Sequence, residues 1–175
     1  RIVVKPPKSL EKNLNNIVAG NTALYGATGG KLFVSGGVGE RFAVRNSGAT
    51  AVIEGAGDHC CEYMTGGQVV ILGEVGANFG AGMTGGFSYV LDEKKSFFDK
   101  CNRELINLDR VLSETMDPHR QNLKLLIEEH YKNTKSMKAK EILEDFERYL
   151  PNFWLVSPVA LSVNDLLKAT TASAA

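Results

Sequence analysis

The sequence has no excess of either charge and no long hydrophobic run. Twenty basic and twenty acidic side chains cancel to a formal net charge of +0 at pH 7. A nucleic-acid-binding or membrane-surface protein would show a basic stripe, so this balance argues against both kinds of partner. No apolar stretch approaches the roughly 20 residues of a membrane-spanning helix, and no signal peptide is predicted. The 175 residues are instead enough for one globular domain with a sizeable core.

Cysteine and catalytic motifs are also scarce. Three cysteines are present, two of them adjacent as Cys60 and Cys61. This odd number does not suit a disulfide framework, and it indicates a reducing compartment. The sequence contains no G-x-S-x-G, no Walker A motif and no pair of carboxylates with a partner base. We therefore predict no catalytic, cofactor-binding or metal-binding residue in this chain.

Glycine, by contrast, is abundant and recurs at a fixed interval between residues 20 and 92. Four units begin at Gly20, Gly39, Gly57 and Gly76, at spacings of 19, 18 and 19 residues. Eight residues after each start stands a hydroxyl residue followed by glycine, and a strand-like run follows. A unit this short cannot bury its own apolar face and must stack on its neighbours. The repeat predicts an all-β solenoid, a parallel β-helix over residues 1–92.

Equivalent residues of the units form columns that predict which side chains face the interior of the coil. Residues two apart on a strand share a face. One inward column is expected to hold Leu32, Ala51, Val69 and Ser88, and the next to hold Val34, Ile53, Ile71 and Val90. A third inward column, nearer the start of each unit, holds Ala23, Phe42, Cys60 and Phe79.

Between the two strand columns lies an apolar stripe of four residues, Phe33, Val52, Val70 and Tyr89. These side chains should point out of the coil, where an apolar stripe requires a cover. The C-terminal helices and a neighbouring domain are both candidates for that cover. We predict that the stripe is an interdomain packing surface.

The N-terminal segment is predicted to belong to a rung. Arg1 to Lys5 aligns with the second half of a unit, so that Ile2 corresponds to Val69 and Val4 to Ile71. We therefore expect at least one further rung before it. Ser9 to Val18 has apolar residues at helical spacing and predicts a short helical excursion.

After residue 92 the pattern changes to a helical closing segment, residues 93–158. Asp117-Pro118 predicts a helix start with Asp117 as its cap, and Ser136 offers a cap for a second helix that Pro151 ends. The stretch 105–112 fits a strand and a helix equally well. Trp154 lies in an apolar segment expected to dock on the rest of the chain. Residues 159–175 are predicted to be a flexible tail.

Three further features resemble functional sites and are interpreted as structural. Gly80 to Gly85 matches the dinucleotide fingerprint G-x-G-x-x-G, but that fingerprint requires a helix directly after it, and a strand is predicted here. Asp58 to Glu62 contains metal-ligating residue types. In a strand, however, Cys60 and Cys61 point to opposite faces, and Cys60 belongs to an inward column. His119 and His130 are expected to be solvated or at helix ends.

Residues 36–55 and 76–86 strongly resemble the C-terminal glycine-repeat (GXGXG) domain of the glutamate synthase large subunit. Residues 1–7, 20–27, 57–64 and 126–150 extend the resemblance to most of the chain before residue 159. It implies a right-handed parallel β-helix with rungs of 18–19 residues, followed by C-terminal α-helices. The parent enzyme is an oxidoreductase that makes two glutamates from glutamine and 2-oxoglutarate, with ferredoxin or NAD(P)H as electron donor.

The resemblance also implies where the chemistry lies. FMN and an iron–sulfur cluster belong to domains upstream of this one, so none of the three cysteines here takes a cluster-binding or catalytic role. The expected partners are the amidotransferase and FMN-binding synthase domains, and the expected compartment is the cytoplasm or the plastid stroma. This chain would then be a non-catalytic scaffold domain.

Two other hypotheses stay open at this point. The first is the related GXGXG subunit of formylmethanofuran dehydrogenase, which the long helical segment disfavours. The second is a stand-alone β-helix acyltransferase, a family that needs an aliphatic residue every six positions. The columns of this sequence do not repeat at six.

Overall fold

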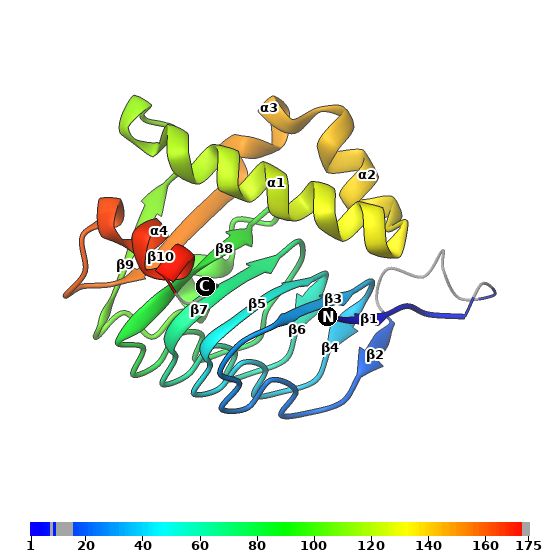
Figure 1. The fold of residues 1–175 in the computed structure, drawn as a ribbon, viewed down its shortest axis with the longest axis horizontal. Helices are drawn as coiled ribbons and strands as arrows, with labels where there is room; N and C mark the ends of the chain where they lie inside the picture. The colour runs from blue at the N-terminus through cyan, green and yellow to red at the C-terminus, as the bar shows by residue number, and fades with distance from the viewer. Residues whose placement is uncertain (8, 10–15, 173–175) are drawn as a thin grey trace.

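The chain forms a mostly parallel β-solenoid of about four turns, covered on one side by helices (Figure 1). The computed structural model describes residues 1–7, 9 and 16–172. The turns pass through a large sheet and a set of tight turns, and three of them also contribute a strand to a small sheet. The predicted solenoid with C-terminal helices is confirmed.

The large sheet has seven strands in the order β1-β3-β5-β7-β8-β10-β9. The five solenoid strands pair in parallel, and Ile2, Leu32, Ala51, Val69 and Ser88 lie side by side in one column. This register is the one that the repeat predicts, including the placement of the N-terminal segment. The strands are β1 (Ile2–Val4), β3 (Lys31–Val34), β5 (Ser47–Ile53), β7 (Thr65–Ile71), β8 (Gly85–Leu91), β9 (Ile106–Arg110) and β10 (Phe153–Pro158).

The small sheet has three short parallel strands, β2 (Ile17–Ala19), β4 (Gly37–Val38) and β6 (Gly55–Ala56). Ile17 and Val18 therefore lie in a strand rather than in the predicted helical excursion. Residues 10–15, which make up most of that excursion, lie outside the described residues.

The hydroxyl–glycine pairs mark places where one rung passes very close to the next. A Cβ added at Gly66 would lie 2.2 Å from the Ser47 carbonyl oxygen, and one at Gly85 would lie 2.0 Å from that of Thr65. These distances are far below van der Waals contact, so only glycine fits. The repeated Thr/Ser-Gly pair is thus a requirement of rung spacing.

The C-terminal end of the solenoid is closed by antiparallel strands. β10 pairs antiparallel with β8 on one side and with β9 on the other. The ambiguous stretch 105–112 therefore contains a strand. Trp154 docks as predicted, but it does so within a strand that the sequence pattern does not reveal.

The helices follow the last rung. They are α1 (Asp117–Thr134), α2 (Met137–Glu144), α3 (Phe146–Tyr149) and α4 (Val163–Ala172). The 3-10 segments are η2 (Phe97–Lys100), η3 (Glu114–Met116) and η4 (Leu150–Asn152). The predicted cap of α2 is confirmed, because Ser136 Oγ accepts a hydrogen bond from the Ala139 amide at 3.0 Å. Asp117, however, lies inside the first turn of α1, and no side chain caps that helix.

The segment predicted to be a flexible tail contains α4. Leu166 of this helix is buried, and the Val163 carbonyl lies 3.0 Å from His119 Nε2. Residues 163–172 of the predicted tail are thus helical, and the start of this helix packs on α1. The sequence does not reveal this docking, because it depends on a contact partner 44 residues away.

The apolar stripe is completely covered by helices of this same chain. Phe33, Val52, Val70 and Tyr89 are each 0% exposed. The covering side chains come mainly from α1 and α2, which lie across the strands in Figure 1, and include Leu123, Leu126, Ile127 and Ile142. The stripe points out of the coil as predicted. Helices of this same chain cover it, however. The stripe is therefore not exposed and cannot make the interdomain contact predicted for it.

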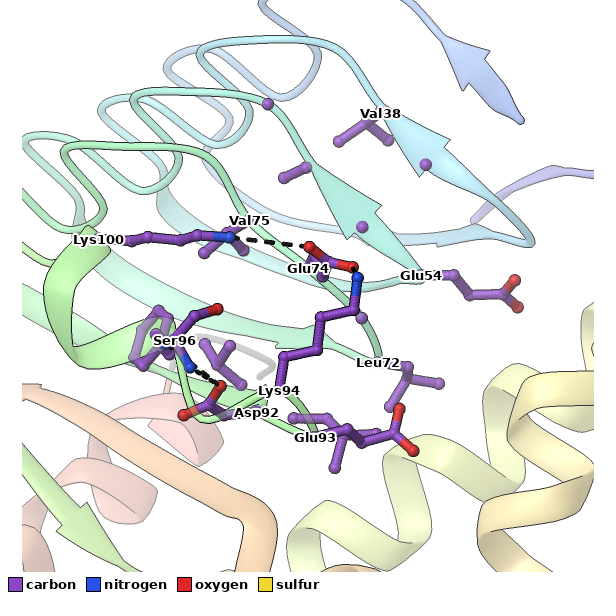
Figure 2. Close-up of a pocket in the computed structure, with 18 of the residues that line it drawn as sticks. Val38, Glu54, Leu72, Glu74, Val75, Asp92, Glu93, Lys94, Ser96 and Lys100 are labelled. Carbon is purple, nitrogen blue, oxygen red and sulfur yellow. Dashed lines mark hydrogen bonds and ion pairs between the residues drawn. The ribbon is translucent and has the colours of Figure 1, made fainter. Parts of the chain in front are cut away.

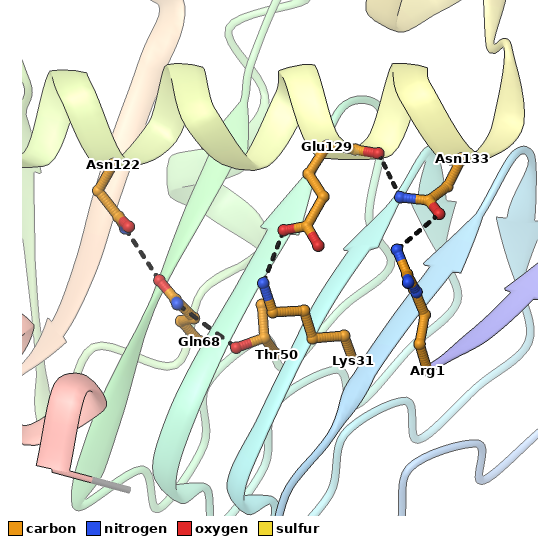
Figure 3. Close-up of polar contacts among 7 residues, drawn as sticks. All are labelled: Arg1, Lys31, Thr50, Gln68, Asn122, Glu129 and Asn133. Carbon is orange, nitrogen blue, oxygen red and sulfur yellow. Dashed lines mark hydrogen bonds and ion pairs between the residues drawn. The ribbon is translucent and has the colours of Figure 1, made fainter. Parts of the chain in front are cut away.

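Polar contacts fix how α1 crosses the strands (Figure 3). Arg1 Nη1 donates to Asn133 Oδ1 at 3.1 Å, and Lys31 Nζ donates to Glu129 Oε2 at 2.7 Å. About two helical turns before Glu129, Asn122 Nδ2 donates to Gln68 Oε1 at 2.9 Å. These contacts step from β1 to β7 along one helix. They are largely exposed and contribute little free energy, but they specify register.

Each rung also contains a set of turns with an alternating backbone. Every second residue has a positive φ, as in Arg41, Ala43 and Arg45 (φ 60°, 56° and 57°) and again in His59, Cys61 and Tyr63. Rung-to-rung hydrogen bonds nevertheless persist, because Arg41 N donates to the Asp58 carbonyl at 2.8 Å. This segment is not a β-strand.

The alternating backbone corrects the prediction made for the two adjacent cysteines. Cys60 and Cys61 do not point to opposite faces. Both are buried in the interior of the coil, with their sulfur atoms 3.7 Å apart. The change from negative to positive φ between neighbours removes the two-residue alternation of a strand. The inward placement of Phe42, Cys60 and Phe79 is confirmed.

The burial of the stripe leads to the first prediction. Val52→Asp places a carboxylate with no partner beneath α1, so we expect a loss of several kcal/mol of folding free energy, enough to abolish cooperative unfolding. Leu125→Asp is the matched control, because Leu125 lies on α1 and is 62% exposed. Urea unfolding followed by circular dichroism measures both. Equal stability of the two variants would contradict the placement of the stripe.

A second prediction concerns His119. The Tyr89 hydroxyl lies 2.8 Å from Nδ1, and Nε2 faces the Val163 carbonyl, so the neutral ring satisfies both contacts. Burial lowers the pKa of His119, although the hydrogen bond to Val163 acts in the opposite direction. The folded state therefore binds fewer protons than the unfolded one, and stability is expected to fall as pH drops through about 6.5. In His119→Gln, urea unfolding at pH 5 and pH 8 should show a smaller difference than in the parent chain. An unchanged difference would assign the pH dependence to other groups.

Candidate functional site

A groove of about 580 Å³ runs along the outer face of the small sheet (Figure 2). Its floor consists of small residues of β4 and β6 and of the next rung, including Gly37, Gly55 and Gly73. A Cβ at Gly73 would lie 2.2 Å from the Glu54 carbonyl oxygen, so close rung packing requires glycine there. The groove exists because this face carries almost no side-chain volume.

The charged side chains of the groove are paired with one another. Glu74 interacts with Lys94 Nζ and, at 3.9 Å, with Lys100 Nζ. The hydrogen bond from Lys94 is the main reason why the pKa of Glu74 lies below its usual value. Across the groove, Lys138 Nζ of α2 donates to Glu93 Oε2 at 2.7 Å. These exposed pairs hold the rim together and offer no free nucleophile or base.

Asp92 anchors the point where the chain leaves the solenoid. Its Oδ1 accepts hydrogen bonds from the amides of Ser96 and Phe97 at 2.9 and 3.2 Å. Its Oδ2 accepts one from Trp154 Nε1 at 3.1 Å, and the guanidinium of Arg110 stacks 3.4 Å from the centre of the Trp154 ring. This buried carboxylate therefore joins the groove wall to β10 and β9. In the sequence it is only the last residue of the repeat.

Glu54 lies at the edge of the groove but faces the helices. Its Oε1 is 3.1 Å from His130 Nε2, and the His130 side chain is 0% exposed. Within the described residues His130 Nδ1 has no hydrogen-bond partner. The expectation that His119 and His130 are solvated is wrong, because both are buried on the face of α1 that packs onto the coil. His119 does lie at a helix end, in the first turn of α1.

The residues from Asp58 to Glu62 make separate contacts and do not converge on one centre. Asp58 Oδ1 accepts a hydrogen bond from the Ala77 amide at 2.7 Å, and His59 Nδ1 lies 2.7 Å from Glu62 Oε1. Burial raises the pKa of the Cys60 thiol. Over residues 1–7, 9 and 16–172, no three His, Cys, Asp or Glu side chains are grouped so that they could hold a metal ion.

The stretch Gly80 to Gly85 forms turns, as predicted. Gly80 and Gly82 have φ of +70° and +67°, and β8 begins at Gly85 without an intervening helix. The helix N-terminus on which a pyrophosphate would rest is missing from this stretch.

In the part of the chain that is described, no helix has both the length and the apolar character needed to cross a membrane.

Comparison with known proteins places this arrangement in a family. The family model described as "GXGXG motif" matches residues 1–159. The chain belongs to the GXGXG family. The matched range includes all the rungs of the described solenoid.

The similar proteins are ferredoxin-dependent glutamate synthases. The chain is 52% identical over 157 residues to the one from Pyropia yezoensis, which covers 90% of this chain and 10% of the relative. It is 57% identical over 141 residues to the chloroplastic protein of Spinacia oleracea, covering 81% of this chain and 8% of the relative. The Synechocystis protein is 52% identical over 157 residues, again 90% of this chain and 10% of the relative. The resemblance to glutamate synthase is confirmed, and the chain spans about a tenth of the length of these relatives.

The geometry around Asp92 yields a third prediction. Asp92→Ala leaves two amides and the Trp154 indole without their acceptor, so we expect a loss of about 1–3 kcal/mol per buried group left unpaired. Asp99→Ala is the control, because Asp99 is exposed in the same segment. Urea unfolding followed by the fluorescence of Trp154, the single tryptophan, reports on this contact directly. Equal stability of the two variants would show that Asp92 does not hold the closing strands.

Proposed function

We propose that this chain is a non-catalytic structural domain of glutamate synthase. The observation that carries the proposal is the sequence match to ferredoxin-dependent glutamate synthases, at 52% identity over 90% of this chain in two relatives. Each of these relatives is about ten times longer than the match. The similar proteins favour this hypothesis over the formylmethanofuran dehydrogenase subunit and the acyltransferase.

The proposed parent enzyme is an oxidoreductase that converts glutamine and 2-oxoglutarate into two glutamates. Its amidotransferase and FMN-binding synthase domains are the proposed partners, and ferredoxin or NAD(P)H the proposed electron donor, with ferredoxin favoured by the names of the relatives. The proposed compartment is the cytoplasm or the plastid stroma, and a similar spinach protein is called chloroplastic.

The cysteines of this chain do not fit an iron–sulfur cluster. Cluster ligands are thiolates that converge on one centre. Cys60 and Cys61 are enclosed by apolar side chains in the coil, where burial raises the pKa of Cys60. Cys101 donates a hydrogen bond to the Phe97 carbonyl at 3.3 Å, and burial raises its pKa to about 12. These thiols favour packing roles, which supports the placement of the cofactors in other domains.

The N-terminal end of the solenoid supports a role within a larger assembly. β1 and β2 are the outermost strands of their sheets in the described chain. Ile2 and Ile17 at this end are 61% and 70% exposed. Exposed apolar edge strands invite pairing with further chain. We infer that another rung or domain of the enzyme covers them.

The fourth prediction tests the non-catalytic role in the full-length glutamate synthase that contains this chain. Glu74→Gln and Lys100→Gln remove charges of the groove, and glutamate formation should stay close to the parent rate. Loss of a general acid or base would instead cost about 10²–10⁴-fold. Ile53→Ala is the structural comparison, since it should cost about 2–5 kcal/mol of stability without a comparable loss of turnover at low temperature. A hundredfold loss in either groove variant, with an unchanged unfolding midpoint, would overturn the proposal.

A further inference from the structure

A second concave surface lies on the tight turns of the solenoid, away from the helices. It encloses about 690 Å³, and every lining residue comes from the four stacked turns or the residues beside them. These turns run along the lower edge of the coil in Figure 1, and α1 lies on the opposite side of the large sheet. We call this surface the arginine–tyrosine face and define it by Tyr25, Arg41, Arg45, His59 and Tyr63.

The arginine–tyrosine face is locally basic although the chain has a net charge of +0. Arg41 and Arg45 are exposed, and neither guanidinium has a hydrogen bond or an ion pair with any described residue. Glu62 is the one acidic residue that lines the surface, and it is already engaged by His59 at 2.7 Å. The two arginines are therefore available to carboxylates from outside the described chain.

The backbone beneath these side chains is strained. Arg41, Arg45, His59 and Tyr63 have φ between 52° and 64°. Glycine accepts this conformation freely, and the turns before and after use it at the position of Arg45 and Tyr63, as Gly26 and Gly82. A larger side chain here is disfavoured. The Arg45 backbone N–H donates to the Glu62 carbonyl at 2.9 Å, as the rung spacing requires. Its guanidinium, however, has no hydrogen bond or ion pair with a described residue that would offset the strain.

The two tyrosines have the character of interface anchors. Tyr25 is 54% exposed and Tyr63 is 60% exposed. The Tyr63 ring lies over Gly82, where an added Cβ would come within 2.5 Å of ring carbons. One side of the ring therefore packs on the Gly82 backbone, and most of the residue is accessible to solvent. Tyrosine and arginine are the residue types that dominate the energetics of protein interfaces.

We propose that the arginine–tyrosine face docks onto an acidic surface elsewhere in the same glutamate synthase polypeptide. This inference rests on the proposed function. The relatives are about ten times longer than the match, so most of the enzyme lies outside this chain. The apolar stripe is already covered within this chain, so it is not available for docking onto the rest of the enzyme. Carboxylates suit the two guanidiniums, because they accept paired hydrogen bonds from each.

Hydroxyl-radical footprinting of the full-length enzyme tests the proposal. Oxidation of Tyr25 and Tyr63 is compared between the native and the urea-denatured enzyme, and Met137 serves as an internal control. Met137 lies at the start of α2, far from the turns in sequence, and is 62% exposed in this chain. Strong protection of both tyrosines with a reactive Met137 is the expected result.

Each alternative occupant gives a different pattern. Reactive tyrosines with protection of other exposed residues, such as Met137 or Ile2, would overturn this inference and leave the structural-domain proposal intact. If no exposed residue of the domain were protected, the result would contradict both the docking inference and the structural-domain proposal. Protection that varies with enzyme concentration would place a second copy on the face. Protection that appears only on addition of a separate acidic protein would place that protein there. Either result would overturn docking within one polypeptide.

Charge substitutions supply the second measurement. In the full-length enzyme, Arg41→Ala combined with Arg45→Ala should raise the oxidation rate of Tyr63 by about thirtyfold, the smallest factor that the loss of an interface hot spot implies. Arg148→Ala is the control, since Arg148 is an exposed arginine on α3. Arg41→Gly with Arg45→Gly separates docking from folding, because glycine relieves the strained backbone and yet removes both charges. Full protection of Tyr63 in both double variants would show that the arginines do not hold the interface.

Discussion

The fold depends on the distance between neighbouring rungs. Strands of a sheet lie about 4.8 Å apart, and every residue of one turn must meet its equivalent in the next at that spacing. The hydroxyl–glycine pairs follow from this limit, since a side chain at Gly66 or Gly85 would collide with a carbonyl of the preceding turn. The inward columns follow from the same spacing, because equivalent apolar side chains of neighbouring rungs pack directly on one another. Even the tight turns keep rung-to-rung hydrogen bonds, although their backbone is not that of a strand.

Features that repeat could be predicted from the sequence. The glycine spacing gave the solenoid, and the column alignment placed Ile2 beside Leu32 and predicted the inward position of Ile53 and Ile71. These inferences work because a repeated constraint leaves the same residue type at the same place several times. The caps of helices are partly readable for a similar reason. The hydroxyl of Ser136 accepts a hydrogen bond from an amide in the first turn of α2, three residues along the chain. Helix α1, by contrast, begins without a side-chain cap.

Features that depend on a single distant contact could not be predicted. Neither Arg41 nor Cys61 is glycine, the usual marker of a positive φ, so the residue type at these positions does not reveal the backbone conformation. The burial of His119 and His130 requires knowing which face of α1 meets the coil. The closing strand β10 and the docking of α4 depend on partners that lie far away in the sequence. An apolar stripe shows that a cover exists, but it carries no information on whether that cover belongs to the same chain. The groove is likewise invisible in sequence, because its floor is defined by what small residues leave open.

The way α1 crosses the solenoid fixes the number of rungs between β1 and β8. An α-helix of 18 residues is about 27 Å long. Five parallel strands at about 4.8 Å occupy roughly 19 Å across. Asn133 near one end of the helix reaches Arg1 beside β1, and His119 near the other reaches Tyr89 on β8. A rung added or lost between these two contacts would shift every later contact by one strand, so the helix admits one number of rungs from β1 to β8. A stack of rungs has no intrinsic length, and over this stretch the covering helix supplies one.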